Sequence, residues 1–349
     1  MLAAKGYAAQ SANATLAPWD FERRDVGPHD VQIDILYCGV CHSDLAQINN
    51  EWFPGIFPMI PGHEIVGRVV KVGEHVKNFK PGDLAGVGTL ANSCGKCSHC
   101  EDGLEVYCEN GVIPTYNGID RYRDNLPTYG GYSNTIVTDE SFTLRISEKL
   151  NLAAAAPLLC AGITTYSPMK HWKVGKGHKV AVLGLGGLGH MAVKFGIALG
   201  AEVTILSTSP HKASDAKKLG AHHFVVTSNA EEVEKVKASF DFIIDTVSAE
   251  HDFDFYLSLL RLNGVHILVG IPPAGFTIKS VGMFQLGRKS VVGSASGGLP
   301  ETQEMLDFCA EHNIVSDIEL IDMKDIHTAF DRMTRGDVKY RFVIDMATL

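Results

Sequence analysis

Four cysteines lie close together in the sequence, at Cys94, Cys97, Cys100 and Cys108. Four thiolates at such short spacings can reach one tetrahedral ion and fill all of its coordination positions, which is the arrangement of a structural zinc. Soft thiolate ligands favour zinc or an iron–sulfur cluster over calcium or magnesium. The pattern therefore predicts a metal that orders a loop and takes no part in catalysis.

Further metal-ligating residues are scattered along the chain, in the segments Cys41-His-Ser-Asp44 and His63-Glu64 and at Cys160. Two cysteines and one histidine leave a fourth coordination position open, which is the ligand set of a catalytic zinc. The spacing alone does not establish that these residues meet, and Cys160 taken alone is more often a buried apolar thiol. Cys38 and Cys309 are expected to be thiols of that kind.

A glycine-rich turn follows the apolar run Val180-Ala-Val-Leu183, with glycines at Gly184, Gly186, Gly187 and Gly189. Gly-x-Gly-x-x-Gly is a weak signal by itself, but here it follows a predicted strand and opens a predicted helix, as a dinucleotide-binding turn does. The first glycine makes the turn, the second lets a pyrophosphate approach the helix N-terminus, and the third lets helix and strand pack closely. The alternative is a glycine-rich turn without a ligand.

The residues after the next strand indicate which dinucleotide binds. An NAD enzyme usually has an acidic residue there, about 20 residues after the motif, to bond the ribose 2′-hydroxyl. This chain has Ser207, Thr208 and Ser209, with Lys212 after them. Hydroxyl donors and a lysine would accept a 2′-phosphate, which an acid would repel. We therefore expect NADP, unless Lys212 is merely a solvated helix residue and the site accepts either cofactor.

The elements that must position these residues change in character along the chain. The first 150 or so residues contain short alternating runs such as Val31–Ile35 and Ile65–Val72, which predict a small all-β barrel with long loops. After Ala153, apolar strands alternate with helices such as 189–199 and 210–219, which predicts a parallel sheet with right-handed crossovers. A helix from Thr302 and a strand at 341–344 complete the expected elements.

Composition limits the classes of partner. The chain has 349 residues, enough for two domains, and its 20% charged and 45% apolar residues are ordinary for a globular protein. The net charge of -9 disfavours nucleic acid or an anionic membrane as a partner. No apolar run of transmembrane length and no signal peptide is recognised, so we expect a cytoplasmic protein whose eight cysteines are metal ligands before they are disulfides.

The segment Gly62-His-Glu-Ile-Val-Gly67, with Gly73 further on, resembles the zinc alcohol dehydrogenase signature of the medium-chain dehydrogenase/reductase superfamily. The order of the metal-ligating segments before a dinucleotide fold matches that superfamily over nearly the whole chain. Segments 38–44, 159–165 and 338–342 are most similar to the cinnamyl alcohol dehydrogenase branch and its broad-specificity bacterial aldehyde reductases. The resemblance implies a zinc-dependent alcohol dehydrogenase that interconverts primary alcohols and aldehydes, aromatic or of medium chain length.

The resemblance also assigns roles around the catalytic zinc. It implies Cys41, His63 and Cys160 as the zinc ligands. It implies Asp44 as the carboxylate that orients His63, and Glu64 as an acid beside the metal that can coordinate it transiently. Ser43 would be the hydroxyl of the proton relay, with a simple turn residue as the alternative.

One position departs from the pattern of the family. Many relatives have a histidine three residues after the relay serine, where this chain has Ala46. The exit route of the proton therefore stays open between the cofactor ribose with water and a path near His42. Ala46 leaves the expected zinc site unchanged.

For the cofactor, the resemblance implies that His42 approaches the pyrophosphate, Thr164 the nicotinamide and Arg341 the phosphates, with backbone contacts from Val269, Gly270 and Ile271. Ordinary surface or core positions are the alternative at each of these residues. The substrate pocket is expected to be lined by apolar side chains, any of which could equally be plain core, at Trp52, Leu90 and Ile113.

The resemblance implies a GroES-like β-barrel catalytic domain over residues 1–158 and 297–349 and a Rossmann domain over 159–296, with the active site in the cleft between them. It also implies a homodimer joined at the exposed edge strand 290–293. Three rivals stay open: a zinc-free quinone or enone reductase, a dinucleotide-binding protein without turnover, and a sugar-alcohol dehydrogenase, which would more typically carry an acid at position 207.

Overall fold

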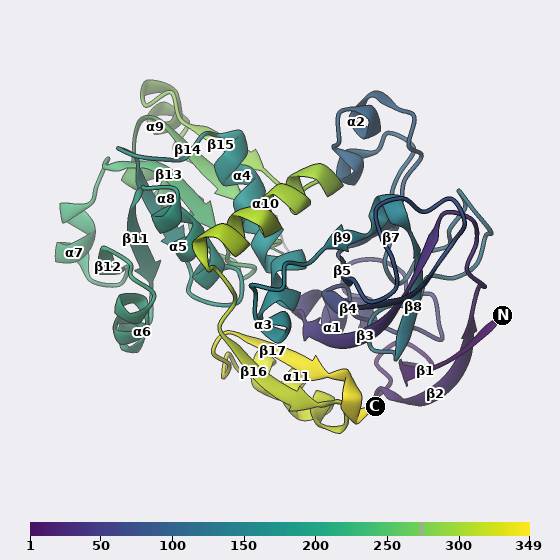
Figure 1. Cartoon of the computed structure of the whole chain (residues 1–349). Helices are drawn as coiled ribbons and strands as arrows, with labels where there is room; N and C mark the ends of the chain where they lie inside the picture. The colour runs from purple at the N-terminus through teal and green to yellow at the C-terminus, as the bar shows by residue number, and fades with distance from the viewer. Residues whose placement is uncertain (273–274) are drawn as a thin grey trace. The chain divides into compact units, whose positions relative to one another are not determined.

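The computed structural model describes residues 1–272 and 275–349. The chain divides into two compact units, the first built from Met1–Ile163 together with Gly297–Leu349 and the second from Thr164–Ser296. The sequence predicts the first boundary after residue 158, five residues before the observed one, and the second after residue 296, as observed. Figure 1 labels the helices and strands of both units.

The first unit is built on a seven-stranded sheet in the order β16-β17-β3-β4-β5-β9, with β8 also paired to β3. The pair β16 and β17 is parallel and the other pairs are antiparallel. Side chains such as Ile33, Ile65 and Phe342 are almost completely buried in its core, and this burial of apolar surface is the main source of its stability. The strands of this sheet are β3 (Asp30–Val40), β4 (Ile65–Val72), β5 (Leu84–Val87), β8 (Thr135–Asp139), β9 (Leu144–Arg145), β16 (Ile318–Asp322) and β17 (Arg341–Asp345).

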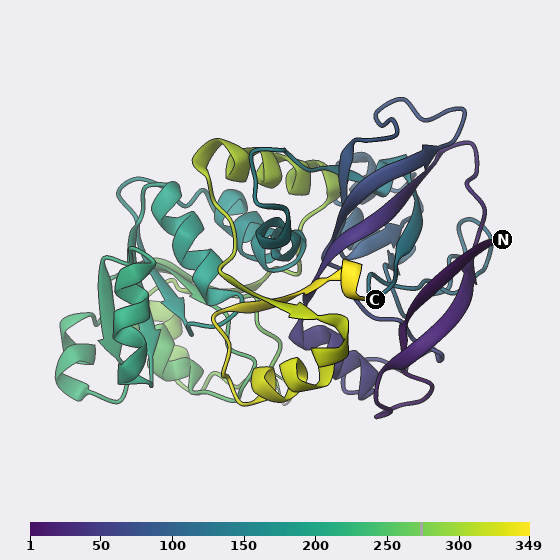
Figure 2. The same cartoon turned by 60° about the horizontal axis from the view of Figure 1, so that its bottom comes forward.

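Two smaller strand pairs and several helices complete the first unit. Figure 2 shows β1 and β2 as a separate antiparallel ribbon near the N-terminus. The remaining strands are β1 (Leu2–Ala8), β2 (Ala17–Arg23), β6 (Leu90–Asn92) and β7 (Ile113–Pro114). The α-helices are α1 (His42–Ile48), α2 (Ser98–Glu101), α3 (Leu152–Ala155), α10 (Leu299–His312) and α11 (Ile326–Thr334). The 3-10 helices are η1 (Glu105–Tyr107), η2 (Glu140–Phe142), η3 (Ala156–Leu159), η5 (Met323–Asp325) and η6 (Met346–Thr348).

The second unit contains a six-stranded, fully parallel sheet in the order β12-β11-β10-β13-β14-β15. This order is that of a doubly wound dinucleotide-binding sheet, so the predicted parallel sheet is confirmed. Every residue of β13 is buried, as expected for a central strand covered on both faces. The strands are β10 (Lys179–Leu183), β11 (Glu202–Ser207), β12 (His223–Val226), β13 (Phe240–Asp245), β14 (Leu260–Leu268) and β15 (Ser290–Gly293).

Helices connect these strands. They are α5 (Gly189–Ala198), η4 (Pro210–Lys212), α6 (Ala213–Lys218), α7 (Ala230–Lys235), α8 (Phe253–Leu259) and α9 (Val281–Leu286), with α4 (Ala161–His171) entering from the first unit. None of the described helices is alone long and apolar enough to cross a membrane. Together the helices of Leu152–Leu159 and Ala161–His171 reach that length and composition, with a bend of 56° between them.

The turn between β10 and α5 requires glycine at the first and last positions of the motif. Gly184 has a positive φ of 88°, which residues with a side chain rarely adopt. A Cβ at Gly186 would meet no atom within 4 Å, so this part of the turn is open. A Cβ at Gly189 would overlap the carbonyl oxygen of Gly184, so the first turn of α5 can pack closely only with glycine there.

We predict that Gly189→Ala destabilises the second unit, because the added methyl group meets backbone that cannot move aside. Overpacking of this kind costs about 1–3 kcal/mol, which lowers the thermal midpoint by about 3–10 °C in a calorimetric scan. Gly186→Ala is the matched control, since its Cβ enters open space. Equal midpoints for the two variants would show that close packing at Gly189 does not matter.

Candidate functional site

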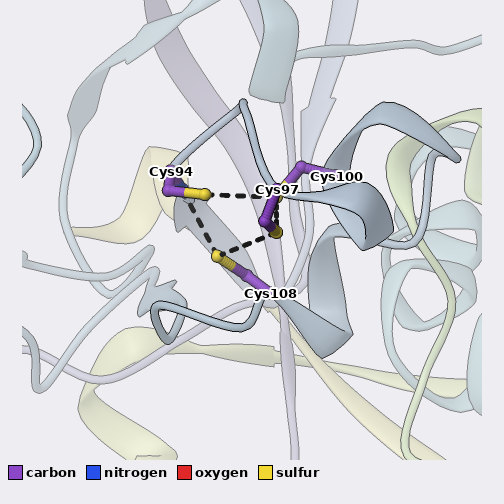
Figure 3. Close-up of side chains that lie close together, drawn as sticks. All are labelled: Cys94, Cys97, Cys100 and Cys108. Atoms are coloured by element: carbon purple, nitrogen blue, oxygen red, sulfur yellow. Dashed lines mark hydrogen bonds between the residues drawn. The ribbon is translucent and has the colours of Figure 1, made fainter.

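The four clustered cysteines lie in the segment between β6 and β7, and their sulfur atoms point toward one another (Figure 3). The Sγ–Sγ separations are 3.9 Å from Cys94 to Cys100, 3.5 Å from Cys97 to Cys100 and 3.9 Å from Cys97 to Cys108. Zinc–sulfur bonds of about 2.3 Å in a tetrahedron separate the sulfurs by about 3.8 Å. All four are free thiols, and the donor set therefore fits a structural zinc.

Polar groups of the same loop already point at the sulfurs. The amide of Asn110 donates to Sγ of Cys94 at 3.3 Å, and the hydroxyl of Ser93 lies 3.3 Å from Sγ of Cys100. The backbone N–H of Lys96 is the main cause that lowers the pKa of Cys94 to about 6, whereas burial raises the pKa of Cys100 to about 11. Hydrogen bonds to sulfur favour the thiolate form that a metal needs.

A second cluster in the first unit consists of Cys41, His63, Glu64 and Cys160, whose ligand atoms all lie within 4.8 Å of one another. Cys41 caps the N-terminus of α1 directly after β3, the His63-Glu64 pair leads into β4, and Cys160 follows η3. The two sulfurs are 3.9 Å apart. The structure thus brings together residues that are separated by up to 119 positions in the sequence.

The buried carboxylate of Asp44 organises this cluster. Its Oδ1 accepts from Nδ1 of His63 at 3.1 Å and from the backbone N–H of Gly62 at 3.2 Å. Its Oδ2 accepts from the backbone N–H of Cys41 at 2.9 Å and from the hydroxyl of Tyr132 at 3.1 Å. Because the Nδ1–H of His63 donates to Asp44, Nε2 is the nitrogen that is left to bind a metal.

The charged surroundings of the cluster alter the acidity of its members. Burial alone would lower the pKa of His63, but the Asp44 carboxylate outweighs burial and raises it to about 10. The hydrogen bond with Cys160 lowers the pKa of Cys41 well below the usual range and raises the pKa of Cys160 well above it. A buried and a half-buried thiol that share one proton in this way form a donor set that a divalent cation would neutralise.

Glu64 and Arg341 form a buried ion pair beside these ligands, with Oε1 of Glu64 bonded to the guanidinium. The other carboxylate oxygen, Oε2, is buried and has no hydrogen-bond partner among the described residues. A Cβ at Gly39 would overlap that oxygen, so glycine on β3 makes room for it. An unpaired buried carboxylate oxygen next to two thiols and an imidazole fits a cation site. The phosphate contact expected of Arg341 stays a prediction.

The expected relay residues lie at the start of α1. Oγ of Ser43 is half-buried and lies 3.5 Å from Nε2 of His63, so the hydroxyl faces the same nitrogen that is free for a metal. His42 is exposed, whereas Ala46 is buried at 1% exposure. A side chain at position 46 therefore lies inside the unit, and the proton relay expected at Ser43 stays a prediction.

In the second unit, the residues expected at the 2′-phosphate gather at the end of β11. Oγ of Ser207 accepts from the backbone N–H of Ser209 at 3.1 Å, and Thr208 between them is exposed. Nζ of Lys212 donates to the carbonyl oxygen of Leu185 at 3.1 Å, which holds the ammonium group beside the glycine turn. A cation and hydroxyl groups beside an open glycine turn fit a phosphorylated dinucleotide.

The other expected cofactor and substrate residues occupy varied environments. Thr164 is buried on α4, and the N–H groups of Val269 and Gly270 both donate to the carbonyl oxygen of Asp245. Ile271 is 53% exposed. Of the expected pocket residues, Leu90 and Ile113 are buried on the paired strands β6 and β7, whereas Trp52 is 36% exposed after α1. Their roles stay predictions.

Three features of the sites were not expected from the sequence: the hydroxyl of Tyr132 on Asp44, the pairing of Glu64 with Arg341, and a cluster in the second unit. That cluster consists of Asp245, His251 and His266. The first two depend on contacts between residues that are distant in the chain, and the third on the path of the loop after β13. Only the aspartate at the end of a predicted parallel strand gave any signal, because strand ends of this kind line ligand sites.

The comparison with protein families covers both units. Residues 27–148 match the alcohol dehydrogenase GroES-like domain, and residues 187–311 match the zinc-binding dehydrogenase family. These matches confirm the predicted fold class of a GroES-like domain combined with a Rossmann domain.

Individual proteins are similar over nearly the full chain. Aldehyde reductase YahK of Escherichia coli strain K12 is 52% identical over 346 residues, which cover 99% of each chain. A cinnamyl alcohol dehydrogenase of Sorghum bicolor superposes with a TM-score of 0.95 at 43% identity, over 99% of this chain and 98% of that one. The CAD of Helicobacter pylori, solved as a complex with NADP(H), has a TM-score of 0.93 at 47% identity and 99% coverage of both. The chain therefore belongs to the zinc-dependent alcohol dehydrogenases of the medium-chain dehydrogenase/reductase superfamily.

Proposed function

We propose that this protein is an NADPH-dependent aldehyde reductase, which interconverts aldehydes and primary alcohols at the cluster of Cys41, His63 and Cys160. The observation that carries the proposal is the orientation of His63: its Nδ1–H donates to Asp44, and Nε2 is left facing two thiols and a hydroxyl. A site with three protein ligands keeps one coordination position open for substrate.

Each residue of the cluster has a separate task. A zinc ion held by Cys41, His63 and Cys160 would act as a Lewis acid on the carbonyl oxygen of the substrate. Asp44 fixes the tautomer and the orientation of the imidazole. Glu64 adds negative charge next to the ligands. The guanidinium of Arg341 compensates this buried charge.

The hydroxyl of Ser43 supports a role in proton transfer. It is half-buried beside Nε2 of His63, where it can give its proton to a substrate oxygen and be reprotonated. The methyl side chain of Ala46 has no proton that it could pass on. Reprotonation therefore proceeds through the exposed His42 next to the serine or through the cofactor ribose with water.

The second unit supports the cofactor assignment. The reduced nicotinamide supplies the hydride, and the chain supplies binding and orientation. Ser207, Thr208, Ser209 and Lys212 suit the 2′-phosphate because they bring a cation and hydroxyl groups without an acid. The CAD of Helicobacter pylori, complexed with NADP(H), is consistent with this choice.

The rival functions lack support. A zinc-free reductase would need neither of the two metal clusters. A binding protein without turnover would have no need for Ser43, Asp44 and Glu64 around an open ligand set. A sugar-alcohol dehydrogenase would be expected to carry an acid where Ser207 stands. Apolar side chains at Trp52, Leu90 and Ile113 favour aromatic or medium-chain aldehydes.

We also propose a homodimer and a cytoplasmic location. The parallel sheet ends at β15, whose backbone can pair with a second copy, and Leu286 and Val281 on the preceding helix are 86% and 56% exposed. The eight cysteines are all free, as expected in a reducing compartment.

Removal of one catalytic ligand tests the activity. Cys160→Ala should lower NADPH oxidation by cinnamaldehyde or benzaldehyde more than about 100-fold, because even changes beside a zinc ligand cost 10–100-fold. The readouts are absorbance at 340 nm and zinc content. Cys309→Ala, at a buried thiol in contact with Met305, is the matched control and should keep both zinc and turnover. Zinc and cofactor bound to the native enzyme without turnover of any aldehyde would favour the binding protein.

The role of the other metal cluster is tested by stability. Cys100→Ser should release one zinc per chain. Because the ligands close a loop from Cys94 to Cys108, comparable to a cross-link worth about 3 kcal/mol, the thermal midpoint should fall by about 6–12 °C. Turnover at low temperature should persist. Ser98→Ala, in the same loop but without sulfur, should change neither quantity. Loss of turnover with an unchanged midpoint would contradict a structural role.

The cofactor assignment is tested at the lysine. Lys212→Ala should raise the KM for NADPH about tenfold, because a charge-assisted hydrogen bond is worth about 1.5–3 kcal/mol, and it should leave the KM for NADH nearly unchanged. Lys218→Ala is the control, since that ammonium group is exposed and paired with Asp215. Equal losses for both cofactors, or faster turnover of NADH by the native enzyme, would refute the NADP assignment.

A further inference from the structure

The second unit contains a buried cluster that the proposed reaction does not use. Asp245 is the last residue of β13, His266 lies on β14, and His251 lies in the loop between β13 and α8. Nε2 of His251 is 2.8 Å and Nε2 of His266 is 2.9 Å from the same carboxylate oxygen, Oδ2 of Asp245. The side chains of Asp245 and His266 are completely buried, and that of His251 is 10% exposed.

The hydrogen bonds determine the charge of His251. Its Nε2 faces the carboxylate of Asp245, and its Nδ1 lies 2.8 Å from the carbonyl oxygen of Ala249. Both oxygens only accept hydrogen bonds, so both ring nitrogens must carry a proton. His251 is therefore an imidazolium in the folded protein.

The second histidine differs. Nδ1 of His266 is buried and has no hydrogen-bond partner among the described residues, so a proton on it would have no acceptor. His266 is therefore neutral, with its single proton on the Nε2 that faces Asp245. The cluster contains one cation and one anion, and its net charge is zero.

The titratable groups around His251 agree with this assignment. The hydrogen bond with Asp245 is the largest influence that raises the pKa of His251, and Asp252 at the start of α8 adds to it. Burial alone would raise the pKa of Asp245, but the bonds from His251 and His266 outweigh it and lower that pKa. The ring of Tyr256 lies edge-on to His251 at 5.5 Å, and burial raises the pKa of this phenol, which stays neutral.

The loop that His251 closes packs against the expected cofactor site. A Cβ at Gly184 would meet Cγ2 of Val247 at 2.9 Å and Oγ1 of Thr246 at 3.0 Å. A Cβ at Gly270 would meet the carbonyl oxygen of Val247 at 2.6 Å. The loop is therefore held against the glycine turn on one side and against the segment expected at the nicotinamide on the other.

Asp245 connects the imidazolium to this loop directly. Its Oδ1 accepts from the backbone N–H of Val247 at 3.0 Å, while Oδ2 accepts from the two histidines. Its carbonyl oxygen accepts from the N–H groups of Val269 and Gly270 at 3.0 and 2.9 Å. A change in the charge of His251 would therefore act on both edges of the cofactor site through one residue.

We propose that His251, as an imidazolium held between the Asp245 carboxylate and the Ala249 carbonyl, is a positioning residue for the cofactor site and makes NADPH affinity depend on pH. The proposal rests on the proposed function, because it takes the glycine turn as the NADPH site. Deprotonation leaves one nitrogen of His251 without a proton to donate, so either the bond to Asp245 or the bond to Ala249 is lost.

The sign of the pH effect follows from the raised pKa. The arrangement that binds NADPH is complete while His251 of the folded protein is protonated, and it is lost as the pH rises through the pKa of His251, which lies above the ordinary histidine value of about 6.5. NADPH should therefore bind more weakly on the alkaline side.

The test is the dissociation constant of NADPH for the full-length protein between pH 6.5 and 9, measured by fluorescence of the bound cofactor. For the native protein it should rise about tenfold through the transition of His251, equivalent to about 1.4 kcal/mol. His251→Gln has no charge to lose, so its affinity should already be about tenfold weaker at pH 6.5 and should change little with pH. Any pH dependence that remains in this variant comes from the phosphate of the cofactor, whose pKa is about 6, and is subtracted from the native profile.

His223→Gln is the matched control. Nε2 of His223 lies 3.0 Å from a carboxylate oxygen of Glu202 on the surface of the same sheet, with its side chain 58% exposed. It should keep the native affinity and the native pH profile. Nitrogen-15 spectra of the native protein at pH 6.5 give a second readout that needs no variant, because both ring nitrogens of His251 should be protonated.

The outcomes separate the two proposals. A native protein that binds no NADPH would refute the proposed function and this inference with it. Native binding with the same affinity and profile in His251→Gln would refute the inference alone, as would a His251 ring that is neutral at pH 6.5. Asp245, His251 and His266 could also hold a metal ion. If the native protein bound a third zinc per chain and His251→Gln did not, the assignment of His251 as an imidazolium would likewise be refuted.

Discussion

The cluster of Cys41, His63, Glu64 and Cys160 depends on one buried carboxylate. Asp44 accepts four hydrogen bonds, from the start of α1, from the segment before β4, from His63 and from Tyr132. A carboxylate with no exposure to solvent is tolerable only when its oxygens are fully bonded. The hydrogen bonds that satisfy the charge of Asp44 also fix the positions of Cys41 and His63. The burial of this carboxylate and the geometry of the ligands therefore depend on the same contacts.

The two metal clusters of the first unit are built for different purposes. The four cysteines come from one short loop and supply a closed set of ligands, which suits a site that holds the chain together. The other set comes from three distant segments, is assembled by the sheet, and has a hydroxyl and an unpaired carboxylate oxygen next to it. Here the fold itself positions the ligands, which is the support that a preorganised site needs.

The parts of the structure that the sequence predicts are those with a local signal. The spacing of Cys94 to Cys108 and the glycines after β10 need only neighbours in the chain, and the parallel sheet follows from alternating strands and helices. The meeting of Cys41, His63 and Cys160 came from family resemblance, because no local pattern encodes it. The bond of Arg341 to Glu64 was not anticipated, since the partner of a buried charge is chosen by the packing of distant segments. The bond of His251 to Asp245 spans only six residues, but it depends on the path of the loop after β13, which no local pattern encodes.

The pairing of β17 with β3 affects the order in which the protein can be completed during synthesis. Residues 164–296 form a continuous segment with its own parallel sheet, so this unit can fold as soon as it has left the ribosome. The sheet of the first unit must wait for Arg341–Asp345, and until then β3 has an open edge and Glu64 has no counter-ion. The unit that begins first is therefore finished last, and the charge of Glu64 is balanced only after residues 341–345 have been made.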